Sequence, residues 1–305
     1  MKVVSKTNNN NDSSWQAFVR SAYGDDKGQV FEVLNKNDET IGSFGWYAKS
    51  KYGQKMLITP PFLTNIGLSF KNPASKGVKH LSNEKELLLA IADQIKSESA
   101  KEIDLVLPYS FKDAQVFQQS GFEVGLKYTY LLDLTQTENE LLANLTSNRR
   151  KNIKQIEKEQ LTFESFDDKK QICQWANETL TKGGAKYDIQ VIETIVEYAV
   201  DEGIAICTTT TKNDTVLAMH FSIILEGVAT YLFSYKKGEL AIAGTCGLWN
   251  NIMTCKQHEA HTFDFAGSSV PRIEKFFREF GGELTPMINI KKSSRLVKLA
   301  KVIKN

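Results

Sequence analysis

The stretch TFDFAGSSVPRIEKFFREFGGELTPMINI, residues 262–290, contains a strand, a turn, a helix and a second strand in succession. Phe263 and Phe265 alternate with a polar residue, as is typical of a short strand. Pro271 suits the first turn of a helix, where its missing N–H is not needed. Gly281 can close that helix because glycine readily adopts the left-handed conformation of a helix end. The stretch therefore predicts a compact strand, helix and strand.

The same order of elements occurs earlier, in IDLVLPYSFKDAQVFQQSGFEVGLKYTYLL, residues 103–132. A shift of 160 residues superimposes four identical residues, namely Asp104 on Asp264, Phe117 on Phe277, Gly121 on Gly281, and Glu123 on Glu283. A fixed offset between similar units indicates an internal repeat. We therefore predict an N-terminal half over residues 1–134 and a C-terminal half over residues 161–305, separated by a junction over residues 135–160.

Composition and charge are those of a soluble globular protein. Of the 305 residues, 41% are hydrophobic and 24% are charged, which leaves enough apolar side chains for two cores. The 38 basic and 36 acidic residues give a formal net charge of +2. This balance gives no global field typical of a nucleic-acid binder, so any attraction for anions must be local.

Cysteine spacing and hydropathy indicate a cytoplasmic protein. The four cysteines form no C-x-x-C pair and no zinc pattern, so we predict buried, reduced thiols and no metal site. Cys255 and His258 make a lone C-x-x-H, which is too little for a zinc site. The N-terminus lacks the apolar segment of a signal peptide, and the longest apolar run, residues 216–225, is too short to span a bilayer. The oligomeric state stays open.

A basic segment lies at the predicted junction. Residues 146–159, TSNRRKNIKQIEKE, follow a short helix that Thr137 and Glu140 introduce as a capping box. We predict a basic helix in which Arg149, Arg150 and Lys154 could bind an anionic substrate, with Arg150 and Lys154 on one side as an i, i+4 pair. The alternative is a solvated charged face. A second basic helix is predicted at the C-terminus, over residues 291–305.

Three further groups in the C-terminal half are candidate site residues. His220 lies in an apolar strand, where it could act as a general base or be a core histidine with one backbone partner. Tyr231 and Tyr235 are predicted to share one face of the next strand, where they could line an acceptor groove or simply pack. Between that strand and the following helix, the segment with Gly244, Thr245 and Gly247 could receive a phosphate, or be an ordinary tight connection.

The order of elements predicted for the second half is strand, two helices, three antiparallel strands, helix, strand, helix and strand. This order resembles the GNAT acyltransferase fold. Two such domains in tandem, the sequence from Arg149 to Ile153, and the element D-F-x-G-S at Asp264–Ser268 together resemble the FemABX superfamily. The resemblance implies an α/β (α+β) protein of two tandem GNAT-like domains, each with a mixed, mainly antiparallel sheet flanked by helices.

The resemblance also implies an activity, the transfer of an acyl group from a thioester donor, acyl-CoA as co-substrate, to an amine acceptor. One alternative is a FemABX-type aminoacyltransferase that takes its amino acid from aminoacyl-tRNA and acts on a nucleotide-linked peptidoglycan precursor. The other is a catalytically silent module that binds an anionic metabolite.

The chain departs from the family patterns at two places. The peptidoglycan-modifying members carry F-K-x-x-F-G, whereas this chain has Phe277 in place of the lysine. Arg278 brings a cation nearby, but one residue along a helix turns the side chain by about 100°. The GNAT phosphate loop reads Q/R-x-x-G-x-G/A, and here only the glycines Gly244 and Gly247 remain, without a leading basic or amide residue.

Overall fold

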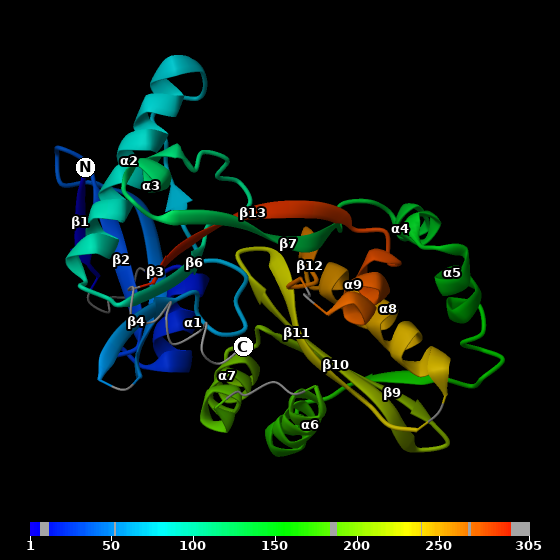
Figure 1. Ribbon diagram of the computed structural model, residues 1–305. Helices are drawn as coiled ribbons and strands as arrows, with labels where there is room; N and C mark the ends of the chain where they lie inside the picture. The colour runs from blue at the N-terminus through cyan, green and yellow to red at the C-terminus, as the bar shows by residue number, and fades with distance from the viewer. Residues whose placement is uncertain (7–11, 52, 184–187, 239, 268–269, 294–305) are drawn as a thin grey trace. The chain divides into compact units, whose positions relative to one another are not determined.

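The computed structural model describes residues 1–6, 12–51, 53–183, 188–238, 240–267 and 270–293 (Figure 1). The chain forms two compact units. Unit 1 comprises Met1–Lys127 together with the chain from Pro286 onward, and unit 2 comprises Tyr128–Thr285. This division differs from the predicted halves, because the junction residues lie within unit 2 and the last strand enters unit 1.

Unit 1 is a sheet with a helix on each face. Its elements are β1 Lys2–Ser5, α1 Ser14–Tyr23, β2 Gly28–Leu34, β3 Thr40–Lys51, β4 Gln54–Ile58, β5 Ser69–Phe70, α2 Gly77–Ser97, β6 Glu102–Val106 and α3 Gln115–Gln119. Strands β1 to β4 pair antiparallel in sequence order, and β4 pairs with β6 in parallel. Successive residues of β3 point to opposite faces: Trp46 joins the core that contains Leu87 and Leu88 of α2, and the ring of Tyr47 contacts Tyr23 of α1.

Unit 2 is a second sheet between two pairs of helices (Figure 1). Its elements are α4 Glu138–Asn144, α5 Ser147–Ile153, β8 Thr162–Ser165, α6 Lys169–Lys182, α7 Ile189–Asp201, β9 Ala205–Lys212, β10 Thr215–Leu225, β11 Val228–Lys236, α8 Ala241–Gln257, β12 Thr262–Asp264 and α9 Pro271–Arg278. Strands β8 to β11 are antiparallel neighbours, and β11 pairs with β12 in parallel. Helix α8 covers one face of β9 and β10, while α6 packs on β11.

Two strands cross between the units along the chain, β7 Glu123–Asp133 and β13 Glu283–Ser293. The last residues of β7 pair antiparallel with β12 in unit 2, and the last residues of β13 pair antiparallel with β6 in unit 1. Each repeat therefore ends in a strand that completes the sheet of the other unit. This exchange explains why the compact units do not coincide with the two halves of the sequence.

The repeat predicted from the 160-residue offset has a structural counterpart. Gly121 follows α3 with φ of +84°, and Gly281 follows α9 with φ of +81°. The equivalent Phe117 and Phe277 are both buried. Apolar residues at the start of α9 are partly exposed, since Val270 at its N-cap is 50% exposed and Ile273 is 40% exposed.

Several sequence predictions concern the segments that flank these elements. The capping box of Thr137 and Glu140 is present at the start of α4. The predicted basic helix is shorter than expected, because α5 ends at Ile153 and residues 154–160 form turns. Residues 291–293, at the start of the predicted C-terminal helix, belong to strand β13, so the prediction was wrong there, and residues 294–305 lie outside the described residues.

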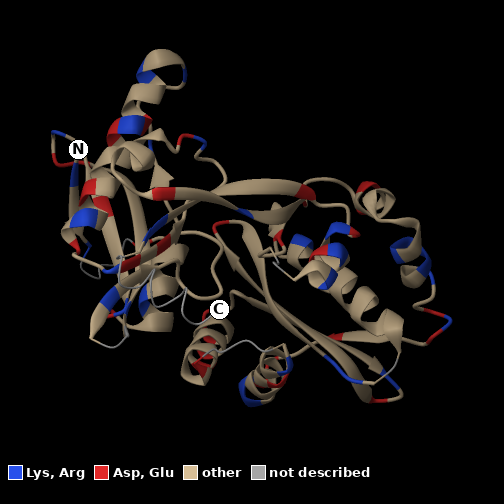
Figure 2. Ribbon diagram, viewed as in Figure 1, with Lys and Arg blue, Asp and Glu red and all other residues tan. Residues whose placement is uncertain are grey.

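Basic and acidic residues are interspersed over each unit, with neither sign dominating (Figure 2). Among the described residues, no helix has the length and apolar character needed to cross a membrane.

Candidate functional site

Strand β11 separates from its parallel neighbour after a short contact. Only three residue pairs join β11 to β12, the last of them Thr230 with Asp264, although β11 continues to Lys236. Beyond Thr230, the edge of β11 that faced β12 has no strand partner in the described part of the chain. The free edge leads directly toward the start of α8. An extended ligand could pair with main-chain groups along such an edge.

The start of α8 can attract an anion. Leu240 at the N-cap makes no side-chain cap, and the first amides of any helix lack intrahelical partners. Lys236 and Lys237 are exposed just before this helix. A Cβ atom placed on Gly244 would lie 3.9 Å from Cδ of Lys236, so this lysine lies beside the first turns of α8. Free amides, the helix dipole and two ammonium groups together favour a phosphate.

Sequence reasoning missed Lys236 and Lys237. The available signal was a pair of adjacent lysines between a predicted strand and a predicted helix. The glycine pattern typical of a phosphate loop placed the predicted site at residues 244–247 instead.

The predicted phosphate segment lies inside α8 rather than before it. Gly244, Thr245 and Gly247 follow the first helical residue, Ala241, by three to six positions. The prediction of a loop here was wrong, because Leu240 already serves as the N-cap. The backbone amides of these three residues belong to the helix, so they are not the free donors of its first turn.

Gly247 allows α8 to approach the sheet closely. A Cβ atom at this position would lie 2.4 Å from Oγ1 of Thr210 on β9, and 2.8 Å and 2.9 Å from Cδ2 and Nε2 of His220 on β10. One turn later, Asn251 is fully buried and donates from Nδ2 to the backbone oxygens of Ile206 and His220. Gly247 is therefore a packing residue, and the side chain of Asn251 fixes the same helix face on the sheet.

His220 lies in the core with one side-chain partner. Its Nδ1 is 2.9 Å from the hydroxyl of Tyr231, and its Nε2 is buried without a partner among the described residues. Burial lowers the pKa of His220 from 6.5 to about 3 and raises the pKa of the Tyr231 phenol above its ordinary value. The imidazole is therefore neutral at physiological pH and a weak base. This environment favours the core histidine over the general base.

Tyr231 and Tyr235 lie on opposite faces of the sheet, so the prediction of a shared face was wrong. The register between β10 and β11 shifts, because Phe221 pairs with Phe233 and the next residue of β10 pairs with Tyr231, which leaves Leu232 unpaired. This bulge reverses the alternation. The ring of Tyr231 contacts Phe277 of α9, whereas Tyr235 stacks on Trp175 of α6 at 5.2 Å.

Arg149 connects three helices. It donates from Nη1 to Oγ1 of Thr245 on α8 at 2.7 Å, and its Nη2 is 2.7 Å from a carboxylate oxygen of Glu279 just after α9. The guanidinium carbon lies 4.4 Å from the centre of the Phe276 ring. Two predicted site residues, Arg149 and Thr245, thus come together. The charge of Arg149 is already balanced by Glu279, so this group holds the helices together.

The other predicted cations are spread over different surroundings. Arg150 donates from Nη1 to the backbone oxygens of Ala143 and Leu145 at the end of α4. Lys154 follows the end of α5 and is exposed. Arg278 is 59% exposed and pairs with Glu274 at 3.0 Å. Arg150 therefore closes α4, and it does not form a free pair with Lys154.

Phe277 occupies the position at which the peptidoglycan-modifying pattern has a lysine. Its ring lies 5.1 Å from that of Phe265 and 5.8 Å from that of Tyr231. Asp264 accepts a hydrogen bond from the amide of Ala266 at 2.8 Å and one from the hydroxyl of Thr129. The aromatic cluster fills the space beside the end of β12, and Asp264 anchors the following turn.

None of the four thiols is activated. All are buried, and burial raises the pKa of Cys173 and Cys246 to about 11, that of Cys255 to about 12, and that of Cys207 further. A thiol with a raised pKa is a poor nucleophile at neutral pH. Among the described residues, no group of three or more His, Cys, Asp or Glu side chains is placed to hold a metal ion.

No known protein family matches the chain by its sequence, and no curated protein sequence matches it. Its structure is similar to several solved structures. FemX has a TM-score of 0.69 and 15% identity, covering 94% of this chain and 97% of FemX. L-PGS from Bacillus licheniformis has a TM-score of 0.56 and 10% identity, covering 96% of each chain. A tandem GNAT protein from the clavulanic acid biosynthesis pathway has a TM-score of 0.51 and 10% identity, covering 95% and 97%.

These similarities cover more than 90% of the chain and therefore include residues of both units. The chain has the FemABX/GNAT-like acyltransferase fold.

Proposed function

We propose that this chain is an acyltransferase that moves an acyl group from a thioester donor, acyl-CoA, to an amine acceptor. The observation that carries the proposal is the divergence of β11 from β12 beside the uncapped start of α8. The free edge of β11 suits an extended donor arm that hydrogen-bonds to main-chain groups. The helix start suits the phosphates at the end of such a donor.

Lys236 and Lys237 are the residues that we assign to the donor phosphates, together with the amides of Ala241 and Ile242. Two ammonium groups and two free N–H groups at one helix start provide charge and direction for a pyrophosphate. These four residues replace the glycines Gly244 and Gly247 as the proposed donor contacts. Thr245 keeps a structural role through Arg149.

The chemistry that follows is direct transfer. The amine attacks the thioester carbonyl, the carbon–sulfur bond breaks, and the thiol leaves with a proton that the amine releases. We assign the stabilisation of the oxyanion of the tetrahedral intermediate to main-chain N–H groups on the free edge of β11. The raised thiol pKa values support transfer without a cysteine-bound intermediate.

Aminoacyl transfer from tRNA is the second candidate, because FemX shares the fold. The aromatic contacts of Phe277 count against it, since a packed ring stands at the position of the lysine in that pattern, and Arg278 is paired with Glu274. A silent binding module is the third candidate. Such a module would keep the free edge of β11 and the start of α8, and it would bind the same anion without turnover.

Thermal unfolding with acetyl-CoA, a long-chain acyl-CoA and free CoA tests the proposal. A ligand at about 100 times its Kd stabilises the folded state by about 2.7 kcal/mol, which raises the unfolding midpoint by several degrees. The variant Lys236→Gln/Lys237→Gln should reduce this rise. The control Lys158→Gln/Lys170→Gln removes two exposed lysines from the same unit and should leave it unchanged.

Turnover separates the enzyme from the silent module. Release of free thiol from acyl-CoA in the presence of a panel of amines would support the acyltransferase. Stabilisation without thiol release from any amine would favour the binding module. If no CoA compound shifts the midpoint, while aminoacyl-tRNA binds, the second candidate replaces the first.

A further inference from the structure

Helix α2 of unit 1 begins with turns that the core does not cover. None of residues 77–86, the first part of this helix, is buried. The buried residues of α2 all come later, and they are Leu87, Leu88, Ile91, Ala92 and Ile95. Figure 1 shows the start of α2 projecting beyond the strands of the sheet.

The projecting end, which we call the α2 tip, comprises residues 71–83 and has a defined structure. Asn72 joins the segment before α2 to the first turns of the helix. Its Nδ2 donates to the backbone oxygen of His80 at 2.9 Å, and its Oδ1 accepts from Nδ2 of Asn83 at 2.9 Å. Nδ1 of His80 lies 2.7 Å from the backbone oxygen of Ala74. The other side chains of the tip are therefore presented on a fixed backbone.

Two apolar side chains of the α2 tip face solvent. Val78 is 82% exposed and Leu81 is 56% exposed. Because they are three positions apart on a helix, they are neighbours on its surface. Scattered exposed apolar residues are ordinary in proteins. Two neighbours at a projecting helix end, however, are placed to enter an apolar phase without any change in the core.

The α2 tip is also basic. Its sequence contains Lys71, Lys76 and Lys79 and no Asp or Glu. All three lysines are exposed, and they make no ion pair within the part of the chain that the structure describes. Three unbalanced ammonium groups thus accompany the two exposed apolar side chains.

The acidic residues that follow the tip on α2 already have cationic or histidine neighbours. A carboxylate oxygen of Glu84 lies 3.8 Å from Nε2 of His80, and the side chain of Glu84 is only 17% exposed. Glu86 binds the N-terminal ammonium group of Met1 at 2.9 Å. These carboxylates therefore leave the charge of the three tip lysines uncompensated.

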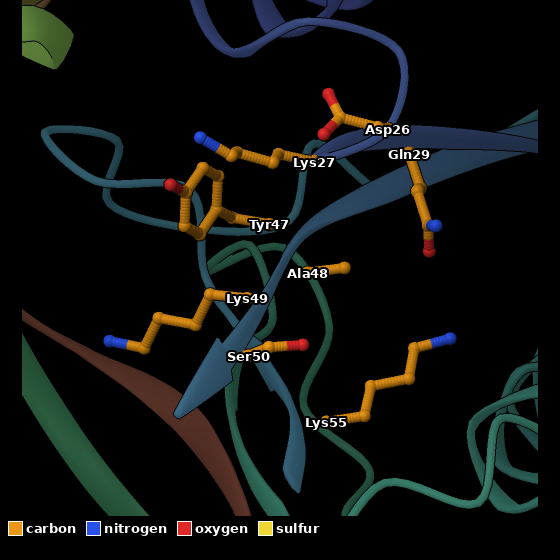
Figure 3. A pocket seen from close by; sticks show the side chains of 8 residues that line it. All are labelled: Asp26, Lys27, Gln29, Tyr47, Ala48, Lys49, Ser50 and Lys55. Atoms are coloured by element: carbon orange, nitrogen blue, oxygen red, sulfur yellow. The ribbon is translucent and has the colours of Figure 1, made fainter. Parts of the chain in front are cut away.

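Other lysines of unit 1 do not gather in this way. Lys27, Lys49 and Lys55 lie around a surface hollow of about 550 Å³, where the lining side chains extend to both sides of β3 (Figure 3). Asp26 also lines the hollow, and Lys55 pairs with Glu98. These lysines therefore form no single basic face.

An anionic membrane surface matches both features of the α2 tip. The bilayer interface takes up apolar side chains, and anionic head groups attract lysines. A lysine is a point charge on a flexible stem, which suits a fluid surface without fixed geometry. Two apolar side chains are too few for a stable protein–protein interface, which buries about 800 Å² per partner. The tip has no Phe, Tyr or Trp on which a nucleobase could stack.

We propose that the α2 tip docks on an anionic membrane surface. Val78 and Leu81 insert among the head groups, while Lys71, Lys76 and Lys79 bind lipid phosphates. Docking of this kind is peripheral and reversible. It involves residues of unit 1 alone, and it does not depend on the donor site proposed at α8 of unit 2.

Co-sedimentation of the full chain with lipid vesicles tests the proposal. The protein should bind vesicles of phosphatidylcholine with about 25% phosphatidylglycerol, and it should not bind phosphatidylcholine alone. Lys71→Gln/Lys76→Gln/Lys79→Gln should weaken binding by on the order of 100-fold, because each lysine near an anionic surface contributes about fivefold. Val78→Ser/Leu81→Ser should weaken it at least about tenfold, because two apolar side chains no longer leave water. Both variants change exposed residues, so their thermal unfolding midpoints should stay close to that of the unaltered protein.

A matched control makes the result specific. Lys27→Gln/Lys49→Gln/Lys101→Gln removes three lysines of unit 1 that lie outside the α2 tip, and it should bind the anionic vesicles within about threefold of the unaltered protein. No binding to anionic vesicles, or an equal loss in this control, would overturn the proposal. Unaltered binding of Val78→Ser/Leu81→Ser would refute the insertion of the apolar pair. If the three tip substitutions abolish binding of tRNA but not of vesicles, the tip belongs to a nucleic-acid surface and the membrane proposal is wrong.

Discussion

Replacing Gly247 by alanine tests whether close packing of α8 on the sheet requires the absence of a side chain. The new Cβ would lie 2.4 Å from Oγ1 of Thr210 and less than 3 Å from two ring atoms of His220. Thr210 is fully buried on a central strand, and the His220 ring is held by Tyr231, so neither neighbour can move away freely. The helix must shift outward, or these side chains must leave their positions.

The expected magnitude is a balance of two effects. Alanine gains about 1 kcal/mol over glycine in a helix interior. Overpacking of a core costs about 1–3 kcal/mol, and disturbing the hydrogen bond of His220 adds about 1 kcal/mol. Gly247→Ala should therefore destabilise the protein by about 2 kcal/mol. In Gly244→Ala, three residues earlier on the same helix, the new Cβ would have its nearest neighbour, Cδ of Lys236, at 3.9 Å, so this variant should be more stable by about 1 kcal/mol.

Thermal unfolding of both variants measures the difference. For a domain of this size about 1 kcal/mol corresponds to roughly 2–4 °C, so the two midpoints should differ by at least about 5 °C, with the unaltered protein between them. Thr210→Ala combined with Gly247→Ala should recover part of the loss by removing the nearest clash. If Gly247→Ala is as stable as Gly244→Ala, the reasoning about the close approach of α8 is refuted.

Three other perturbations have expected outcomes. Arg149→Ala should lower the free energy of unfolding by about 1–3 kcal/mol, because its carboxylate and hydroxyl partners lose their donor, and Arg149→Lys should recover part of this in the same thermal assay. Gly281→Ala should lower the free energy of unfolding, measured with denaturant, more than Gly121→Ala does. Both glycines have a positive φ, but only the new Cβ at position 281 would meet another residue, at 2.5 Å from the backbone oxygen of Asn144. Equal losses in the two variants would contradict this. His220 has a folded pKa of about 3 against 6.5 when unfolded, so the unfolded chain takes up a proton first as pH falls, and stability present above pH 6.5 is lost below it. Between pH 6.5 and 5 this loss is about 2 kcal/mol, and His220→Asn should show a correspondingly smaller decline; parallel pH profiles would show that His220 does not cause it.

Local patterns predicted most elements of this protein correctly. The stretch over residues 262–290 contains its own strand signal, helix start and glycine stop, and each depends on neighbours within a few residues. The capping box at Thr137 and the turn anchored by Asp264 are present for the same reason. The repeat at an offset of 160 residues was also visible, because equivalent positions in both halves carry the same side chains.

The site was predicted less well, because its features depend on register and on contacts between distant segments. A single bulge at Leu232 puts Tyr231 and Tyr235 on opposite faces, and a period-two pattern cannot reveal an inserted residue. Arg149 meets Thr245 across 96 residues of chain, and nothing near either residue indicates the pairing. Helix α8 begins at Ala241, before Gly244 and Gly247, because apolar residues form its first turn.

The sequence by itself determined the elements, the repeat and the fold class, because helix and strand periodicity, caps and glycine stops act over short distances. Only the tertiary structure decided how the repeats are divided into units. The last strand of each repeat completes the other sheet, since β7 pairs with β12 and β13 pairs with β6. Strand pairing is set by hydrogen bonds and burial between segments far apart in the chain, and the alternation within one strand does not specify its partner.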